Sequence, residues 1–377
     1  MSWDGQDQED SRVNAWRSQT LIPRALDIIS TEMTHTLHES EAVRSSEGKA
    51  AAFNSQRPGF KNLISACGLA ELTGRAQIRL NGKDRTRWLN GMMTNNIRDL
   101  AAGHGVYGFL LNPQGQIQGD LYAYNCSDYL LIETDRPQLE NVLKLFRRYI
   151  IMDKVEITES NDVAFQITGP KAAEVLASAG FELPDLQPLQ FIQLQWNGLS
   201  CTIARQDMPC VPSFEIWCSA SDGKAIYEAL AKSGAATVEE DALEFLRIAC
   251  GIPRYGVDIQ ERNLPQETEQ TRALNFNKGC YIGQEIVERI RSRGNVHRKF
   301  MGFVIEGAVP ALNTTLQIDG KAVGEITSVA ALPLGESLQN VALGYLRREF
   351  ATPGTKIPLE NGQVIVASLP FINIFEQ

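Results

Sequence analysis

The sequence predicts a protein of mixed α and β structure, with a polar N-terminal arm, an α+β core and a small all-β C-terminal domain. Three observations predict this organisation. Residues 1–57 are polar and mixed in character, strand-like segments alternate with helix-like ones up to Phe300, and the segments after Phe300 are strand-like. The chain has 377 residues, of which 43% are hydrophobic and 21% charged, ordinary values for a globular protein of two or three domains.

The N-terminal arm contains one amphipathic stretch, Leu21–Met33, and ends in an Arg-, Ser- and Gln-rich run at Arg57. We expect the arm to be partly helical and partly flexible. Its acidic start resembles neither a secretion signal nor an Arg-rich transit peptide, and no apolar run approaches the ~18 residues that a membrane span needs. The sequence therefore predicts a cytoplasmic protein with no membrane association.

The α+β core contains two kinds of periodic segment. Alternating patterns bounded by turn residues predict strands at residues 77–80, 106–111, 121–132, 155–158 and 163–168. Helical periodicity predicts helices at residues 84–90, 137–149 and 172–180. Thr237 and Glu240 have the spacing of a capping box, so we expect a further helix from Thr237 to Gly251.

The C-terminal segments are short and strand-like, with a strong hairpin signal at Asp319 and Gly320. Strands are expected at residues 302–305, 315–318, 323–328, 341–346 and 364–369. The sequence therefore predicts an all-β domain over residues 301–377.

Charge and cysteine content exclude several classes of function. The net charge is -9, which disfavours direct nucleic-acid binding. The odd number of cysteines and the lack of a C-x-x-C pair indicate neither a disulfide framework nor a zinc site, and His35 and His38 lie outside any metal-binding pattern. No metal centre is predicted.

Three glycines, Gly103, Gly105 and Gly108, match the G-x-G-x-x-G spacing of dinucleotide-binding loops. That motif requires a strand before it and a helix start after it. Here a helix and a loop precede the glycines and a strand follows them. The pattern therefore indicates a turn of small residues.

The most informative segment surrounds Cys280, which lies just upstream of a predicted helix and two residues after Lys278. A helix N-terminus and a nearby ammonium both favour a thiolate, so the segment predicts a reactive thiol. The alternative is a turn in which the cysteine only packs. The motif residues are Lys278, Gly279, Cys280, Tyr281, Gly283, Gln284 and Glu285.

The string KGCYIGQE resembles the signature of the YgfZ family of folate-binding proteins, which are related to a mitochondrial iron-sulfur assembly factor and to the glycine-cleavage aminomethyltransferase. Residues 80–95, the string YGFLLNPQGQIQGD at residues 107–120, and residues 302–350 resemble further parts of that family. The resemblance covers about residues 58–370. It implies two interlocked ferredoxin-like α+β subdomains within residues 58–300 and a C-terminal β-barrel, around a funnel that takes tetrahydrofolate or a derivative.

The resemblance also implies a set of site residues. Asp120 matches the acidic residue beside the reactive nitrogens of the folate, and Glu215 matches the carboxylate that holds the pterin. Tyr107, Arg247 and Lys278 are the other expected cofactor-binding residues, and Asp120 and Cys280 are the candidate catalytic ones. From the pattern alone, Asp120 could equally be a turn residue and Glu215 a solvent-facing strand position.

The resemblance leaves three functions open. The first is an accessory protein for assembly or repair of iron-sulfur clusters that supports tRNA-modifying enzymes, with iron-sulfur proteins as partners. The second is a tetrahydrofolate-dependent aminomethyltransferase or demethylase. The presence of Cys280 would distinguish the accessory proteins from these enzymes. The third is an interaction module with a vestigial pocket, because Ala249 replaces the glutamate of the family's LRxExG pattern. A basic run, residues 289–299, could attract the folate's glutamate tail or an acidic partner.

Overall fold

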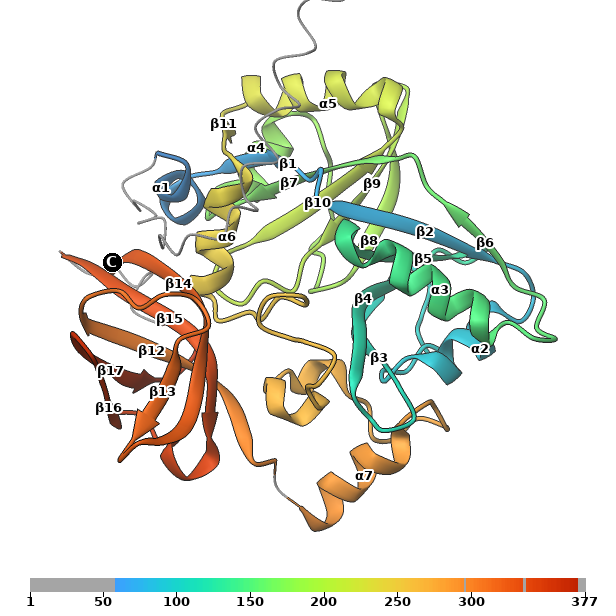
Figure 1. Ribbon diagram of the computed structural model, residues 1–377. Coiled ribbons are helices and arrows are strands. Elements are labelled where there is room, and N and C mark those ends of the chain that lie inside the picture. The colour runs from blue at the N-terminus through green and yellow to red at the C-terminus, as the bar shows by residue number, and fades with distance from the viewer. Residues whose placement is uncertain (1–57, 295, 335–336, 372–377) are drawn as a thin grey trace, which may run out of the picture. The chain divides into compact units, whose positions relative to one another are not determined.

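The computed structural model describes residues 58–294, 296–334 and 337–371, all within one unit of the chain, Lys49–Gln377 (Figure 1). The predicted N-terminal arm, with Leu21–Met33, His35 and His38, lies outside the described residues. The described residues form three β-sheets with helices packed against them. None of the helices in this part of the chain has the length and apolar character that crossing a membrane requires.

The first sheet has six strands in the order β11-β1-β7-β10-β9-β8. These are β1 (Gly68–Glu71), β7 (Val163–Thr168), β8 (Phe191–Trp196), β9 (Leu199–Arg205), β10 (Ser213–Cys218) and β11 (Ala236–Thr237). Helices α4 (Ala172–Ser178) and α5 (Ala220–Lys232) bury their apolar sides against one face of this sheet. Burial of that apolar surface holds the helices in place.

The second sheet has five strands in the order β3-β4-β5-β2-β6. These are β2 (Arg75–Asn81), β3 (Gly105–Leu111), β4 (Ile117–Asn125), β5 (Leu130–Asp135) and β6 (Glu156–Glu159). Helices α2 (Arg85–Met92) and α3 (Leu139–Tyr149), the latter preceded by the 3-10 turn η2 (Arg136–Gln138), cover one face. The whole sheet is inserted in the chain between β1 and β7.

Two sequence predictions in this region need comment. The single strand expected at 121–132 is wrong, because the chain turns between Cys126 and Tyr129 and forms β4 and β5 instead. Ser127 adopts a φ of +66° in that turn. The prediction for the glycine pattern is confirmed, since β3 begins at Gly105 and no helix follows it.

The uncovered faces of the two sheets pack against each other. Tyr124 and Leu131 of the second sheet meet Phe191, Ala204 and Trp217 of the first in one apolar cluster. The rings of Tyr124 and Trp217 lie 4.9 Å apart in an edge-to-face arrangement. This cluster fills the middle of the interface and leaves polar side chains at its ends.

Helix α6 (Glu240–Ala249) packs with α1 (Pro58–Ser65) in a further core that also receives strands of the C-terminal sheet. The predicted capping box is wrong. Thr237 belongs to β11 and its hydroxyl accepts a hydrogen bond from Tyr227, while Glu240 accepts one from Thr73. The helix therefore begins at Glu240.

The third sheet is the predicted C-terminal β structure, in the order β13-β14-β15-β12-β17-β16. Its strands are β12 (Arg298–Gly307), β13 (Thr315–Ile318), β14 (Lys321–Leu334), β15 (Ser337–Arg347), β16 (Lys356–Leu359) and β17 (Gly362–Ala367). The edge strands β13 and β16 contact each other, so the sheet is nearly closed, like a barrel (Figure 1). Asp319 and Gly320 both have positive φ, as the predicted two-residue hairpin requires.

The segment between α6 and the third sheet packs over β3 and β4. It contains the 3-10 turns η3 (Pro265–Thr268) and η4 (Thr271–Ala273) and helix α7 (Gln284–Arg293), and a last 3-10 turn, η5 (Arg348–Phe350), follows β15. The segment thus brings residues from late in the chain against the sheet that carries Asp120.

Candidate functional site

A cavity of about 160 Å³ lies where the polar end of the second sheet meets α6 and the segment after it. Its lining includes Arg75, Tyr107, Asp120, Tyr122, Glu133, Asp135, Arg247, Arg254 and Arg272. A larger cavity of about 550 Å³ shares Arg75, Asp135, Arg247 and Arg254 with it. We call these two cavities together the central cleft.

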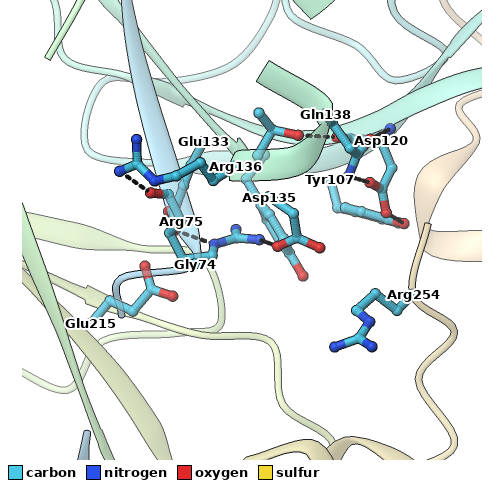
Figure 2. A network of polar contacts seen from close by, with 12 residues as sticks. Gly74, Arg75, Tyr107, Asp120, Glu133, Asp135, Arg136, Gln138, Glu215 and Arg254 are labelled. Carbon is cyan, nitrogen blue, oxygen red and sulfur yellow. Dashed lines mark hydrogen bonds and ion pairs between the residues drawn. The ribbon is translucent and has the colours of Figure 1, made fainter. Parts of the chain in front are cut away.

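Two neighbouring side chains hold the carboxyl of Asp120 in position at the wall of the central cleft. Tyr107 donates its hydroxyl hydrogen to Asp120 Oδ2 at 2.6 Å, and Gln138 Nε2 donates to Oδ1 at 2.7 Å (Figure 2). Burial and the charge of Asp135 raise the pKa of Asp120, although the two hydrogen bonds oppose that shift. The carboxyl is thus fixed in position and holds a proton more readily than a free aspartate.

Tyr107 is held in turn by Arg272, which the sequence interpretation missed. The Arg272 guanidinium lies 4.4 Å from the centre of the Tyr107 ring and forms an ion pair with Asp207. Tyr122 also donates to Asp207, at 3.2 Å. Because these residues come from four separate segments, no local sequence pattern predicts their contact.

Glu215 lies behind the wall of the cleft. It is only 4% exposed and is not among the residues that line either cavity of the cleft, so it is not the solvent-facing strand position that the pattern also allowed. Trp217 Nε1 donates to its Oε2 at 3.1 Å. Burial, and then the negative charge of Glu133, raise the pKa of Glu215 well above its usual range.

Arg75 connects this buried acid to the cleft. Its Nε lies 2.8 Å from Glu133 Oε1 and its Nη1 lies 2.6 Å from Asp135 Oδ1. Figure 2 shows Arg75 between these carboxylates, with Glu215 on its other side. The Glu133 side chain is fully buried and interacts with the carboxyl of Glu215 as well as with Arg75. The sequence interpretation missed both Arg75 and Glu133, because charged residues at alternate strand positions usually face solvent.

Arg247 lines the cleft, yet protein groups occupy all five of its N–H donors. It donates twice to Glu244, at 2.8 and 2.7 Å, once to Asp258 at 2.7 Å, once to Ser328 at 3.0 Å, and once to the Ile252 carbonyl. Its side chain is 12% exposed and that of Asp258 is fully buried. Arg247 therefore links α6, the segment that follows it and β14 through hydrogen bonds.

Arg254 is the more available cation of the cleft. Its side chain is 43% exposed and makes one ion pair, at 3.1 Å, with Glu244. It lines both cavities of the cleft and lies apart from the Arg75 network in Figure 2. An anionic group entering the cleft would therefore find Arg254 with unpaired donors.

The motif loop around Cys280 lies elsewhere, at the end of α2. Lys278 Nζ donates to the carbonyls of Asn90 and Met93, both at 2.5 Å, and lies 4.7 Å from the centre of the Tyr281 ring. Burial lowers the pKa of Lys278 to about 7, while the carbonyls and the ring favour its charged form. Its ammonium is thus engaged by the last turn of α2, where it satisfies carbonyls that the helix leaves unpaired.

The loop is packed tightly on its other side too. Gly283 has a φ of +80°, and a Cβ there would lie 2.6 Å from the Asn112 carbonyl oxygen. A Cβ at Gly115 would lie 2.7 Å from Ile286 of α7. Three of the four parts of the chain that carry the family resemblance, residues 80–95, 107–120 and 278–285, therefore meet in space.

Cys280 is the exposed cysteine among the seven, all of which lie in the described part of the chain and are free thiols. It does not belong to the lining of the central cleft. Gly279 and Glu285 are also exposed, whereas Tyr281 is buried and Gln284 begins α7. The structure thus brings Tyr107, Asp120 and Arg247 together, and it places Lys278 and Cys280 apart from them.

A further cavity of about 530 Å³, lined by Gln77, Arg79 and Trp217 among others, contains none of the predicted site residues. It opens at the other end of the interface between the first two sheets. Among the described residues, no group of three or more His, Cys, Asp or Glu side chains is placed to hold a metal ion.

The chain matches one family model and is similar to several known proteins. The family model described as the GCVT N-terminal domain matches residues 31–278. A putative chloroplastic transferase of Arabidopsis thaliana is 23% identical over 351 residues, covering 91% of this chain and 80% of that protein. An aminomethyltransferase of Caldanaerobacter subterraneus is 26% identical over 330 residues, covering 82% of this chain and 86% of that protein. The crystal structure of glycine cleavage system aminomethyltransferase T from Bartonella henselae has the same fold, with a TM-score of 0.75 and 22% identity over 84% of this chain and 89% of that one.

Proposed function

Because the chain belongs to the family of the GCVT N-terminal domain, we propose that it binds tetrahydrofolate or a derivative in the central cleft. The observation that carries the proposal is the Asp120 carboxyl, held at the cleft wall by Tyr107 and Gln138. A fixed carboxyl with a raised pKa can exchange a hydrogen bond or a proton with a ring nitrogen.

The residues of the cleft suit the two ends of a folate. The neighbouring carboxyls of Glu133 and Glu215 can accept hydrogen bonds from an amino-pyrimidinone edge, and Arg75 balances the charge. Arg254 offers unpaired donors for the carboxylates of the glutamate tail. When bound, tetrahydrofolate supplies nitrogens that can carry a one-carbon unit. Arg247 holds the wall of the cleft.

Of the functions open to such a protein, we favour the accessory role of the YgfZ group in assembly or repair of iron-sulfur clusters. Cys280 supports this choice, because it presents an exposed thiol on a loop that its neighbours hold firmly, outside the cleft. A thiol in that position can meet a protein partner, such as an iron-sulfur enzyme, while the cleft is occupied.

The second candidate is one-carbon transfer, as in an aminomethyltransferase or a demethylase. The specific observation that favours it is the raised pKa of Asp120, which suits a residue that gives and takes a proton. The aminomethyltransferases among the relatives add support.

The test is calorimetric titration of the full chain, under anaerobic reducing conditions, with tetrahydrofolate and with a tetrahydropterin that lacks the glutamate tail. We expect both to bind, and we expect Arg254→Met to weaken tetrahydrofolate about tenfold without affecting the tetrahydropterin. Asp99→Asn, a change at an exposed pair with Arg98, is the matched control and should behave as wild type. Absence of binding by the unaltered protein would overturn the folate proposal.

The same samples separate the two roles. Turnover with an aminomethyl or N-methyl donor, lost in Asp120→Asn with binding retained, would establish transfer. Folate binding without turnover supports the accessory role, and loss of cluster-enzyme activity in cells carrying Cys280→Ser would strengthen it.

A further inference from the structure

Two other cysteines, far apart in the sequence, contact each other beside the central cleft. Cys250 directly follows α6 and is 3% exposed, and Cys210 lies half-buried in the segment 206–212 that joins β9 to β10. The Cys250 sulfur interacts with both the thiol and the backbone N–H of Cys210. Cys210 also packs against the apolar cluster that contains Cys250. The two sulfurs therefore face each other.

The surroundings give the two thiols different roles. Cys250 donates its thiol hydrogen to Cys210, and this hydrogen bond lowers the pKa of Cys210, whereas burial raises the pKa of Cys250. Cys210 is the more accessible sulfur and Cys250 the more protected one. A cavity of about 470 Å³, large enough for a small thiol compound to approach, is lined by Cys250 and by Pro209, the chain neighbour of Cys210. An accessible nucleophile beside a buried second thiol is the arrangement that thiol–disulfide exchange needs.

We propose that Cys210 and Cys250 form a thiol–disulfide exchange site, which reacts with a small-molecule disulfide of the glutathione type and closes to an intramolecular disulfide. The Cys210 thiolate attacks one sulfur of the small disulfide, forms a mixed disulfide and releases one thiolate. Cys250, after losing its proton, attacks the Cys210 sulfur and releases the second thiolate. The two protein thiols are oxidised and the small disulfide is reduced to two thiols, so the step balances.

The bond would join two parts of the cleft wall. The segment 206–212 carries Asp207, whose ion pair holds Arg272 over the Tyr107 ring. Cys250 lies two residues before Ile252, whose carbonyl accepts a hydrogen bond from Arg247. Oxidation would therefore fasten the Asp207 segment to the end of α6, next to the ring that holds Asp120.

The chain contains a matched control pair. Cys201 of β9 and Cys218 of β10 are directly opposite each other in the first sheet, and both are buried. Burial raises the pKa of Cys201 to about 11 and that of Cys218 to about 12. Both residues line the cavity of about 530 Å³, so a small disulfide can approach them as well, but their raised pKa values keep the thiols protonated. We therefore expect this pair to remain reduced where Cys210 and Cys250 react.

The test equilibrates the full chain with reduced and oxidised glutathione over a range of ratios, quenches with acid, alkylates, and maps cysteine peptides by mass spectrometry. We expect a peptide linked through Cys210 and Cys250 that dithiothreitol reverses, and no link between Cys201 and Cys218. Cys250→Ser should stop the reaction at a glutathione adduct on Cys210, and Cys210→Ser should leave Cys250 unmodified. The proposal fails if no linked peptide forms in oxidised glutathione alone, if the control pair links equally, or if Cys250 is modified in Cys210→Ser.

Discussion

Replacing Arg247 with methionine tests whether this arginine ties the protein together or binds the ligand. The change keeps the length of the side chain and removes all five donors, leaving the fully buried Asp258 without its cation. Breaking a buried ion pair by removing one partner costs about 3–5 kcal/mol. The hydroxyl and backbone donors that Asp258 keeps from Ser328 and Arg254 limit the loss, so we expect the lower half of that range.

The assay is urea unfolding followed by tryptophan fluorescence, with the transition midpoint as the measured quantity. Arg254→Met is the matched control, because Arg254 shares the partner Glu244 but is 43% exposed, and it should cost no more than about 1 kcal/mol. Arg247→Met should shift the midpoint strongly and Arg254→Met hardly at all. If both shift it equally little, and only Arg247→Met abolishes folate binding, Arg247 is a ligand group and the reasoning is refuted.

Four further predictions follow from the site. Folate affinity should rise with pH, by at most about tenfold per unit, because burial and the charge of Glu133 raise the pKa of Glu215, whereas two donors of the pterin edge favour its charged form; calorimetry at several pH values checks this. Glu215→Gln should weaken binding by about 1.5–3 kcal/mol and flatten that profile, and unchanged affinity would remove Glu215 from the site. Brief iodoacetamide treatment should label Cys280 before the other thiols, since it is the exposed one, whereas labelling no faster than at Cys126 would make it structural. Lys278→Met should destabilise the fold by about 1–3 kcal/mol in urea unfolding, because two helix-end carbonyls lose their donor; a neutral result would show that water replaces it.

Local structure could largely be predicted from the sequence. Apolar alternation and turn residues identified β7, β13 and the Asp319–Gly320 hairpin, because these signals act between neighbouring residues. The prediction of a capping box at Thr237 was wrong because contacts with residues distant in the sequence decided the structure there. Its residues found better partners in Tyr227 and Thr73, which lie outside the helix.

In the candidate site, too, the residues within local sequence strings could be predicted, and those brought together by tertiary packing could not. The family strings identified Tyr107 and Asp120, and the structure places them in contact at the cleft. Arg75 and Glu133 were missed because only the packing of two sheets buries such charged strand positions. Likewise, the expectation that Lys278 assists Cys280 assumed that neighbours in sequence interact, whereas the lysine side chain turns toward the end of α2.

The interior position of β1 in the first sheet has a consequence for the order of folding. All strands of the second sheet come from residues 75–159, so they can pair as soon as that stretch has been synthesised. β1 precedes them in the chain, yet both of its neighbours, β7 and β11, are made after them. During synthesis both edges of β1 therefore remain unpaired until β7 and β11 have been made, and an unpaired strand edge can associate with other chains. Mutations that slow pairing within the second sheet should lengthen this wait and reduce the yield of folded protein, even where the finished molecule is as stable as before.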